Sequence, residues 1–262
     1  MQLYVEETGK IGAPSIVFLH GVGTSSWMWW RQVASFPDFH CINLDLPGHG
    51  KSDHVPWVSL ADTAHQIAEL IQSRATNGRA HLVGLSLGAY VGLILMEHHA
   101  SLVDCAILSG VTSSPMPNRI FLRPHLWLMS KFKKSRKSVE RQAKSLHLTS
   151  DEQTAYTENF MKMSMLTYRT IFEEVVGFHV PAALGQVHVP TLITAGGNES
   201  KIILQAVGML PTIMPNAKGC IAPGLGHGWN LEDPDLFNAM LRAWIGNEPL
   251  PRELKQADTF GA

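Results

Sequence analysis

The sequence predicts an α/β fold, built on a doubly wound, mostly parallel sheet of about seven strands. Short, continuously apolar runs such as Ser15–Leu19 are typical of strands that are buried on both faces of a parallel sheet. Stretches with helical apolar periodicity, such as Leu60–Thr76, lie between these runs. Polar residues that could take part in catalysis follow several of the runs, at the carboxyl ends of the strands, where catalytic groups of such folds lie.

Strands and helices alternate along most of the chain. The predicted strands cover residues 2–6, 15–19, 39–44, a run that ends at residue 84, 103–108, 190–195 and 218–222. The predicted helices cover residues 27–36, 60–76, a stretch that begins at residue 87, 202–210 and 234–245. An alternation of this kind places helices on both faces of one sheet.

The alternation is interrupted between residues 113 and 185. Strand-like runs disappear there, while Met, aromatic and basic residues recur at helical spacings and prolines punctuate the segment. We expect residues 113–185 to form a helical lid, inserted into a core made of residues 1–112 and 186–246. Residues 247–262 are polar and contain two prolines, which predicts a loosely packed C-terminal tail.

Composition limits the classes of function. The 262 residues carry a formal net charge of −1, with 45% hydrophobic and 16% charged residues. This balance supports a large core and gives no bulk charge to attract nucleic acid or a membrane surface. The three cysteines, Cys41, Cys105 and Cys220, are far apart and odd in number, so we expect buried thiols in a reducing compartment. The sequence shows no signal-peptide pattern and no apolar run of membrane-spanning length, which predicts a cytoplasmic protein.

One serine stands at a predicted strand-to-helix junction, in the pattern Gly-x-Ser-x-Gly formed by Gly84, Ser86 and Gly88. A serine on such a tight turn has a strained backbone and projects its hydroxyl from the sheet edge. Strand and helix then pass so close that side chains at the two glycines would clash. The helix start also offers free N–H groups where negative charge can develop. The plain alternative is a glycine-containing junction with an ordinary serine.

Two other segments favour the catalytic interpretation. His20-Gly21 follows an earlier strand, and Gly226-His227 lies near the end of the chain. A nucleophile followed by an acid and then a histidine is the chain order of one of the common catalytic triads.

These motifs resemble those of the α/β-hydrolase-fold serine hydrolases of the small bacterial esterase type. The matching stretches are residues 20–23, 45–52, 84–88 and 223–229, which span almost the whole chain outside the predicted lid. Compared with the family's usual layout, the first strand is missing, so we expect seven core strands. The lid follows the strand at residues 103–108, which is the sixth strand of that layout.

The resemblance implies a role for each matching residue. Ser86 is expected to be the nucleophile and His227 the general base. The backbone N–H groups of Val22 and Leu87 are expected to form the oxyanion hole. No cofactor and no metal are implied.

The acid is where this sequence departs from the family pattern. The family usually carries an aspartate after the seventh strand, and Gly196-Gly197-Asn198-Glu199 places a glutamate there. A glutamate suffices chemically, because the carboxylate only orients and stabilises the imidazole. The alternative position, residues 109–113, has no carboxylate. We expect Asp233 to cap a helix and Asp45 to be a structural loop residue.

Candidate substrate contacts come from aromatic and Met residues near the motifs and in the predicted lid. They are Trp27, Met28, Trp127 and Trp229. Core packing is an equally good account of Trp27 or Met28. Met residues in the lid form an adaptable apolar ceiling in this interpretation, and packing of the lid on the sheet is the alternative for each of them.

The leading hypothesis is a serine hydrolase that cleaves carboxylic esters of small to medium hydrophobic acids through an acyl-enzyme. Its partner is a small-molecule ester, and we expect a monomer or homodimer. A lactonase, a carbon–carbon bond hydrolase or an acyltransferase would use the same residues. A small-ligand receptor on the same scaffold is the hypothesis from another class.

Overall fold

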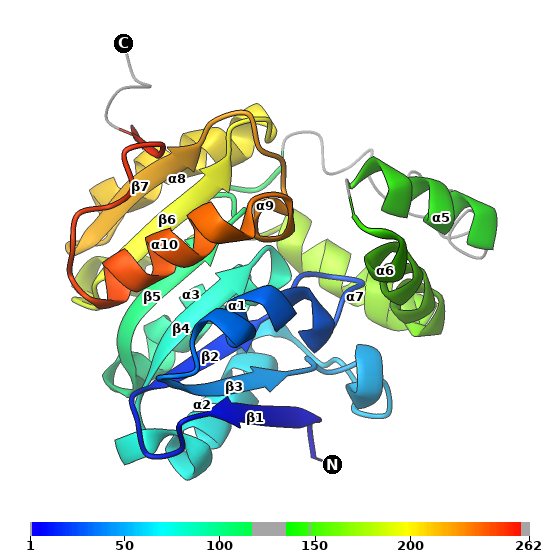
Figure 1. The fold of residues 1–262 in the computed structure, drawn as a ribbon, viewed down its shortest axis with the longest axis horizontal. Coiled ribbons are helices and arrows are strands. Elements are labelled where there is room, and N and C mark those ends of the chain that lie inside the picture. The colour runs from blue at the N-terminus through cyan, green and yellow to red at the C-terminus, as the bar shows by residue number, and fades with distance from the viewer. Residues whose placement is uncertain (1, 117–134, 147, 258–262) are drawn as a thin grey trace.

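The computed structural model describes residues 2–116, 135–146 and 148–257. Its centre is one sheet with the strand order β1-β3-β2-β4-β5-β6-β7-β8 (Figure 1). The strands are β1 (Val5–Gly9), β2 (Ser15–Leu19), β3 (His40–Leu44), β4 (Ala80–Leu85), β5 (Val103–Ser109), β6 (Thr191–Gly196), β7 (Ala217–Ala222) and β8 (Lys255–Gln256). Strands β3 to β7 of this order pair in parallel, whereas β1 and β8 pair antiparallel at the two edges.

The doubly wound, mostly parallel sheet is therefore confirmed, and the strand count is corrected from seven to eight. The additional strand, β8, lies in the segment predicted to be a loose tail. It escaped prediction because its two residues are exposed and polar and form no apolar run. Leu254 and Ala257 flank it and are buried, so loose packing is wrong for residues 254–257. The first strand also begins later than predicted, at Val5.

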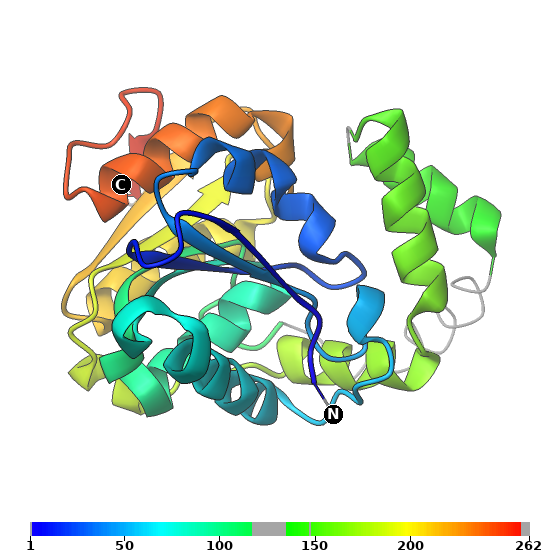
Figure 2. The same cartoon turned by 60° about the horizontal axis from the view of Figure 1, so that its bottom comes forward.

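Helices cover both faces of the sheet (Figures 1 and 2). The core helices are α1 (Trp30–Ser35), α2 (Leu60–Arg74), α3 (Leu87–His99), α8 (Lys201–Ile213), α9 (Trp229–Glu232) and α10 (Pro234–Ile245). One apolar cluster joins the sheet to α2, α3 and α8, and a second joins it to α1 and α10. No helix in the described ranges is long and apolar enough to cross a membrane.

Strand β2 shows why the central strands are continuously apolar. All five of its residues are buried. Val17 and Leu19 belong to the cluster with α2 and α3, whereas Ile16 and Phe18 belong to the cluster with α1 and α10. Because successive side chains point to opposite faces and both faces are covered, every position is apolar or small.

In the described part of the segment between β5 and β6, the regular elements are all helical. It contains α5 (Arg136–Ser145), α6 (Ser150–Lys162) and α7 (Met165–Val176). Helices α5 and α6 stand to one side of the core (Figure 2), whereas α7 packs against it through the buried Ile171. Helix α6 begins with a capping box, in which the Thr149 side chain accepts from Glu152 N–H and the Glu152 carboxylate accepts from Thr149 N–H. A Cβ added at Gly48, in the turn after β3, would lie 2.6 Å from Thr167 of α7. The insertion therefore packs beyond the carboxyl ends of the strands, and its action as a lid stays a prediction.

The three cysteines are free and buried, as the sequence predicts. Burial raises the pKa of Cys41 and Cys105 to about 12 and that of Cys220 to about 11. These thiols therefore act as small core residues.

Candidate active site

Ser86 occupies a strained turn between β4 and α3. Its backbone has φ 53° and ψ −115°, which is a rare conformation for any residue with a side chain. The turn is fixed by two backbone bonds, from Ser86 N–H to the Ser109 carbonyl at 2.8 Å and from Gly88 N–H to the His20 carbonyl at 3.0 Å. Ser86 is partly exposed, although the residues on either side of it are buried.

The two glycines of the motif are sterically required, as predicted. A Cβ at Gly84 would lie 2.6 Å from the Gly88 carbonyl oxygen. A Cβ at Gly88 would overlap the Leu19 carbonyl. Strand β2, strand β4 and helix α3 meet here with no space for a side chain, and this packing holds the serine turn in place.

The loop that follows β2 lies against Ser86. A Cβ at Gly21 would be 3.6 Å from Ser86 Cβ. Among the described residues, neither Val22 N–H nor Leu87 N–H has a hydrogen-bond acceptor. Two backbone donors are therefore unpaired beside the serine, where an oxyanion would need them.

His20 supports this loop as a neutral side chain. Leu46 N–H donates to His20 Nε2 at 2.9 Å, so that nitrogen carries no proton, and Nδ1 donates to the Gly21 carbonyl at 2.8 Å. Burial lowers the pKa of His20 to about 4. These contacts give His20 a structural role in the loop.

His227 forms the second half of the candidate site. It lies in the turn after β7, and its Nδ1 is 2.8 Å from Oε2 of Glu199, in the turn after β6. The Glu199 side chain is 3% exposed and that of His227 is 40% exposed. Burial acts to lower the pKa of His227, but the hydrogen bond and the charge of Glu199 outweigh it, so the pKa is raised.

Gly110 brings the two halves together. It follows β5, directly after the Ser109 carbonyl that binds the Ser86 backbone. A Cβ at Gly110 would lie 2.7 Å from His227 Cε1, so only glycine lets the imidazole approach this edge. The Ser86 hydroxyl makes no hydrogen bond to His227 or to any other described residue. The structure thus pairs His227 with Glu199 and places Ser86 at the same carboxyl ends of the strands. It shows no direct hydrogen bond between Ser86 and His227. Such bonds are often long before substrate binds.

The other carboxylates near the motifs have structural partners. Asp45 accepts hydrogen bonds from Ser26 N–H and Lys51 N–H, both at 2.7 Å. Asp233 accepts from Leu236 N–H at 3.1 Å and caps α10. Both agree with the roles that the sequence predicts.

Trp229, which the sequence predicts as a substrate contact, lies inside the core of the structure. Its side chain is fully buried. Its Nε1–H donates to Ser109 Oγ at 3.0 Å, and its ring packs on Phe237 with centroids 4.5 Å apart. Trp229 therefore supports the end of β5 and has no surface to offer a substrate.

Neither Met28 nor Trp27 is brought to the site. Met28 is 3% exposed, and its Sδ accepts from Gly21 N–H at 3.3 Å, so it supports the loop after β2 from the core side. Trp27 lines a different groove of about 670 Å³, beside β1 and α6, whose lining includes none of Ser86, Glu199 and His227. Trp127 lies outside the described residues.

The sequence analysis did not single out Phe160 and its aromatic neighbours in the insertion. Phe160 of α6 lies against Gly23, where an added Cβ would be 3.0 Å from Phe160 Cε2. Its ring stacks on Tyr156 at 5.7 Å and meets Tyr168 edge-on at 5.6 Å. The spacing of Tyr156 and Phe160 on one helix was the available signal.

The described residues contain no group of three His, Cys, Asp or Glu side chains arranged to hold a metal ion. The site combines a serine hydroxyl on a strained turn, two unpaired backbone amides and an imidazole that is paired with a buried carboxylate. Such groups serve attack on an acyl carbon.

A model of the alpha/beta hydrolase family matches residues 16–240. The putative carbamate hydrolase RutD of Pseudomonas syringae pv. syringae (strain B728a) is 30% identical over 254 residues, covering 90% of this chain and 95% of that protein. The pimeloyl-(acyl-carrier protein) methyl ester esterase of Vibrio vulnificus (strain YJ016) is 36% identical over 103 residues, covering 39% of this chain and 38% of that protein. The solved structure of the enol-lactonase from Burkholderia xenovorans LB400 has a TM-score of 0.74 at 19% identity, covering 93% of this chain and 96% of that chain. The family match confirms the resemblance that the motifs indicate, and the structural likeness confirms the fold.

Proposed function

We propose that this chain, which belongs to the alpha/beta hydrolase family, is a serine hydrolase that cleaves carboxylic esters of small to medium hydrophobic acids. One observation carries the proposal. Three features lie together at the carboxyl ends of the strands. They are the strained Ser86, the unpaired amides of Val22 and Leu87, and the His227–Glu199 pair.

The proposed reaction begins with the Ser86 hydroxyl. Its oxygen attacks the acyl carbon of the ester while its proton passes to Nε2 of His227. The negative charge on the former carbonyl oxygen is bound by the N–H groups of Val22 and Leu87. Glu199 stabilises the imidazolium ion through Nδ1, at the 2.8 Å contact.

The tetrahedral intermediate then collapses. The bond to the alcohol oxygen breaks, and His227 gives its proton to the leaving alkoxide, which departs as the alcohol. The acyl group remains on Ser86 as an ester. A water molecule, deprotonated by His227, attacks that ester, and the second collapse releases the acid and returns the proton to Ser86.

Esters are the favoured substrate class for two reasons. The relatives named above include a methyl ester esterase and a carbamate hydrolase, and both names describe attack on an acyl carbon. In this chain, Phe160 lies against the loop beside Ser86 and packs on Tyr156 and Tyr168, which makes this side of the site apolar. The same residues would serve a lactone, which is a cyclic ester.

The test combines labelling with turnover. A fluorophosphonate probe should label the wild-type protein at Ser86, as read by intact mass and peptide mapping, and p-nitrophenyl esters from acetate to decanoate should be hydrolysed. Ser86→Ala should abolish both. Glu97→Gln, near the far end of α3, is a control substitution away from the candidate site and should leave both unchanged. A folded wild-type protein that takes no label and hydrolyses no ester of the series would refute the proposal.

A further inference from the structure

Helix α6 of the insertion lies along the segment that follows β2. Near its C-terminal end, Phe160 covers Gly23, as described above. One residue earlier, Asn159 Nδ2 donates to Ser25 Oγ at 3.1 Å. Two consecutive residues of the helix therefore contact the loop that carries the Val22 amide.

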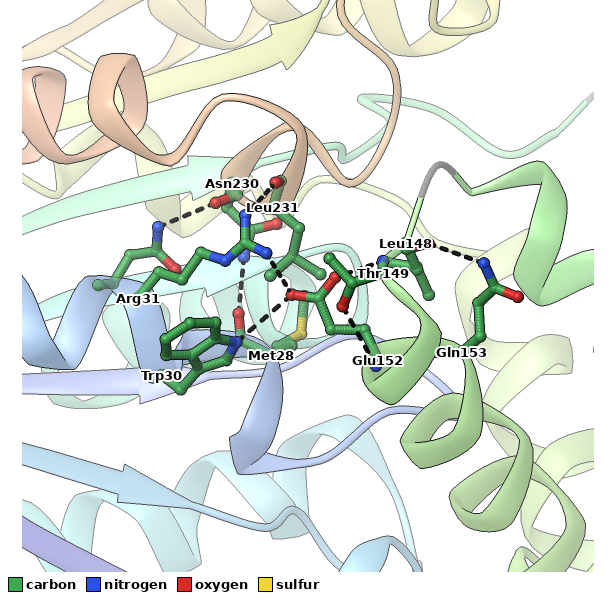
Figure 3. A network of polar contacts seen from close by, with 10 residues as sticks. Met28, Trp30, Arg31, Leu148, Thr149, Glu152, Gln153, Asn230 and Leu231 are labelled. Atoms are coloured by element: carbon green, nitrogen blue, oxygen red, sulfur yellow. Dashed lines mark hydrogen bonds and ion pairs between the residues drawn. The ribbon is translucent and has the colours of Figure 1, made fainter.

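The other end of α6 is attached to the same segment by a buried carboxylate (Figure 3). Glu152 Oε1 accepts from Arg31 Nη2 at 2.9 Å and from Trp30 Nε1 at 3.4 Å. The Glu152 side chain is 6% exposed and that of Arg31 is 22% exposed. Because this pair is largely removed from water, loss of one partner leaves an uncompensated charge.

The segment is fixed to the core on its other side. Arg31 Nη1 donates to the Leu231 carbonyl, and Gln32 Nε2 to the Asn230 carbonyl, both at 2.9 Å. Asn230 Nδ2 returns a bond to the Met28 carbonyl at 3.0 Å (Figure 3). The helix α1 region is thus anchored to α9, which begins just after the turn that carries the imidazole.

We propose that α6 holds in place the loop after β2 that carries the Val22 amide, with Glu152 and Phe160 as positioning residues. The inference rests on the proposed function, because the loop matters to the rate only if Val22 N–H binds the oxyanion. Donors of this kind act at hydrogen-bond distance from an oxygen whose charge develops in the transition state. Losing the support of α6 therefore lowers kcat and leaves KM nearly unchanged.

The experiment compares Glu152→Gln with Glu158→Gln on p-nitrophenyl acetate, whose acyl group is too small to need contacts in a lid. Glutamine at position 152 keeps the capping box and removes the charge that Arg31 binds. Glu158 lies on the same helix and pairs with Arg136 of α5, so its variant breaks an ion pair inside the insertion. We expect kcat of the first variant to fall roughly tenfold, less than the ~10²–10³-fold of losing a donor outright, with KM within about twofold. The control should match wild type.

Phe160→Leu and Phe160→Ala give a second, independent perturbation. The alanine variant should lose more kcat than the leucine variant, since leucine still covers Gly23. Deuterium uptake of peptides from residues 20–31 should rise in Glu152→Gln and Phe160→Ala, and should be unchanged in Glu158→Gln. This readout needs no activity.

The outcomes separate this proposal from the proposed function. A raised KM with unchanged kcat means that α6 shapes the acyl pocket and overturns the positioning role. A lowered melting temperature with unchanged kcat and uptake overturns it too. If the wild type hydrolyses no ester and takes no fluorophosphonate label, the proposed function fails. Unchanged uptake in both variants would then overturn the holding role of α6 separately.

Discussion

Replacing Glu199 with glutamine tests the centre of the candidate site. The substitution keeps the size of the side chain and removes the charge that lies 2.8 Å from His227 Nδ1. Two unit charges at this distance interact by about 1.5 kcal/mol at the dielectric constant of water and by about 6 kcal/mol at an effective value near 20. The His227 side chain is 40% exposed, which places the effect towards the lower figure. Removal of the Glu199 charge therefore lowers the pKa of His227 from its raised value.

The sign of the pH effect follows from the causes of the shift. In the wild type, Glu199 raises the pKa of His227 above its ordinary value, 6.5, against the lowering effect of burial. The base must be neutral to accept the serine proton, so kcat/KM should rise with pH through this raised pKa. In Glu199→Gln only burial remains, and the acid limb should move to lower pH.

The rate should fall as well. An amide N–H that donates to Nδ1 stabilises the tautomer whose proton is on Nε2, and that imidazole cannot accept the serine proton. The corresponding substitution in a well-studied serine protease costs about 10⁴ in kcat, and we expect a loss of about 10³–10⁴ here.

The assay is kcat/KM for p-nitrophenyl butyrate between about pH 5 and pH 9. Glu199→Asp serves as the companion variant, because it keeps the charge and changes only the reach. A Glu199→Gln enzyme with an unshifted acid limb and less than a tenfold loss would refute the assignment of Glu199 as the acid.

Two glycine predictions test the packing of the site, each with a matched control. Gly110→Ala places a Cβ 2.7 Å from His227 Cε1 at φ +74°, whereas Gly224→Ala meets nothing within 4 Å at a similar φ of +76°. Ester hydrolysis should therefore fall at least about tenfold only in the first, and equal losses would mean that backbone strain alone is responsible. Gly88→Ala overlaps the backbone beside it and should lower the free energy of unfolding by about 3 kcal/mol or prevent folding. Gly208→Ala, in an open position of α8, should raise it by about 0.5–1 kcal/mol in urea denaturation, and a stabilised Gly88→Ala would contradict the close packing.

The elements with strong local signals could be predicted from the sequence. Strands that are buried on both faces, such as β2 and β6, appear as runs rich in apolar residues and were placed within a residue or two. The glycines around Ser86 are visible because backbone atoms approach there, which no other residue permits. Strand β8 gave no signal, because two exposed polar residues at a sheet edge resemble a loop.

Side-chain direction was the part that the sequence did not determine. Trp27, Met28 and Trp229 lie close in sequence to the motifs, but proximity does not tell which face of a short helix a side chain occupies. Trp229 begins a helix of four residues and points into the core. The Arg31–Glu152 contact joins residues 121 positions apart, so no local pattern could reveal it.

The two carboxylate oxygens of Glu199 have different surroundings. Oε2 reaches His227, while Oε1 is buried without a hydrogen-bond partner among the described residues. A buried carboxylate oxygen with no donor is costly, so the charge is compensated chiefly by the imidazole. Because the Glu199 charge depends on the imidazole for compensation, the protonated form of His227 is favoured, in agreement with its raised pKa. In the proposed reaction the same preference stabilises the imidazolium ion that forms as Ser86 attacks, so the unpaired oxygen increases the benefit of proton transfer to His227.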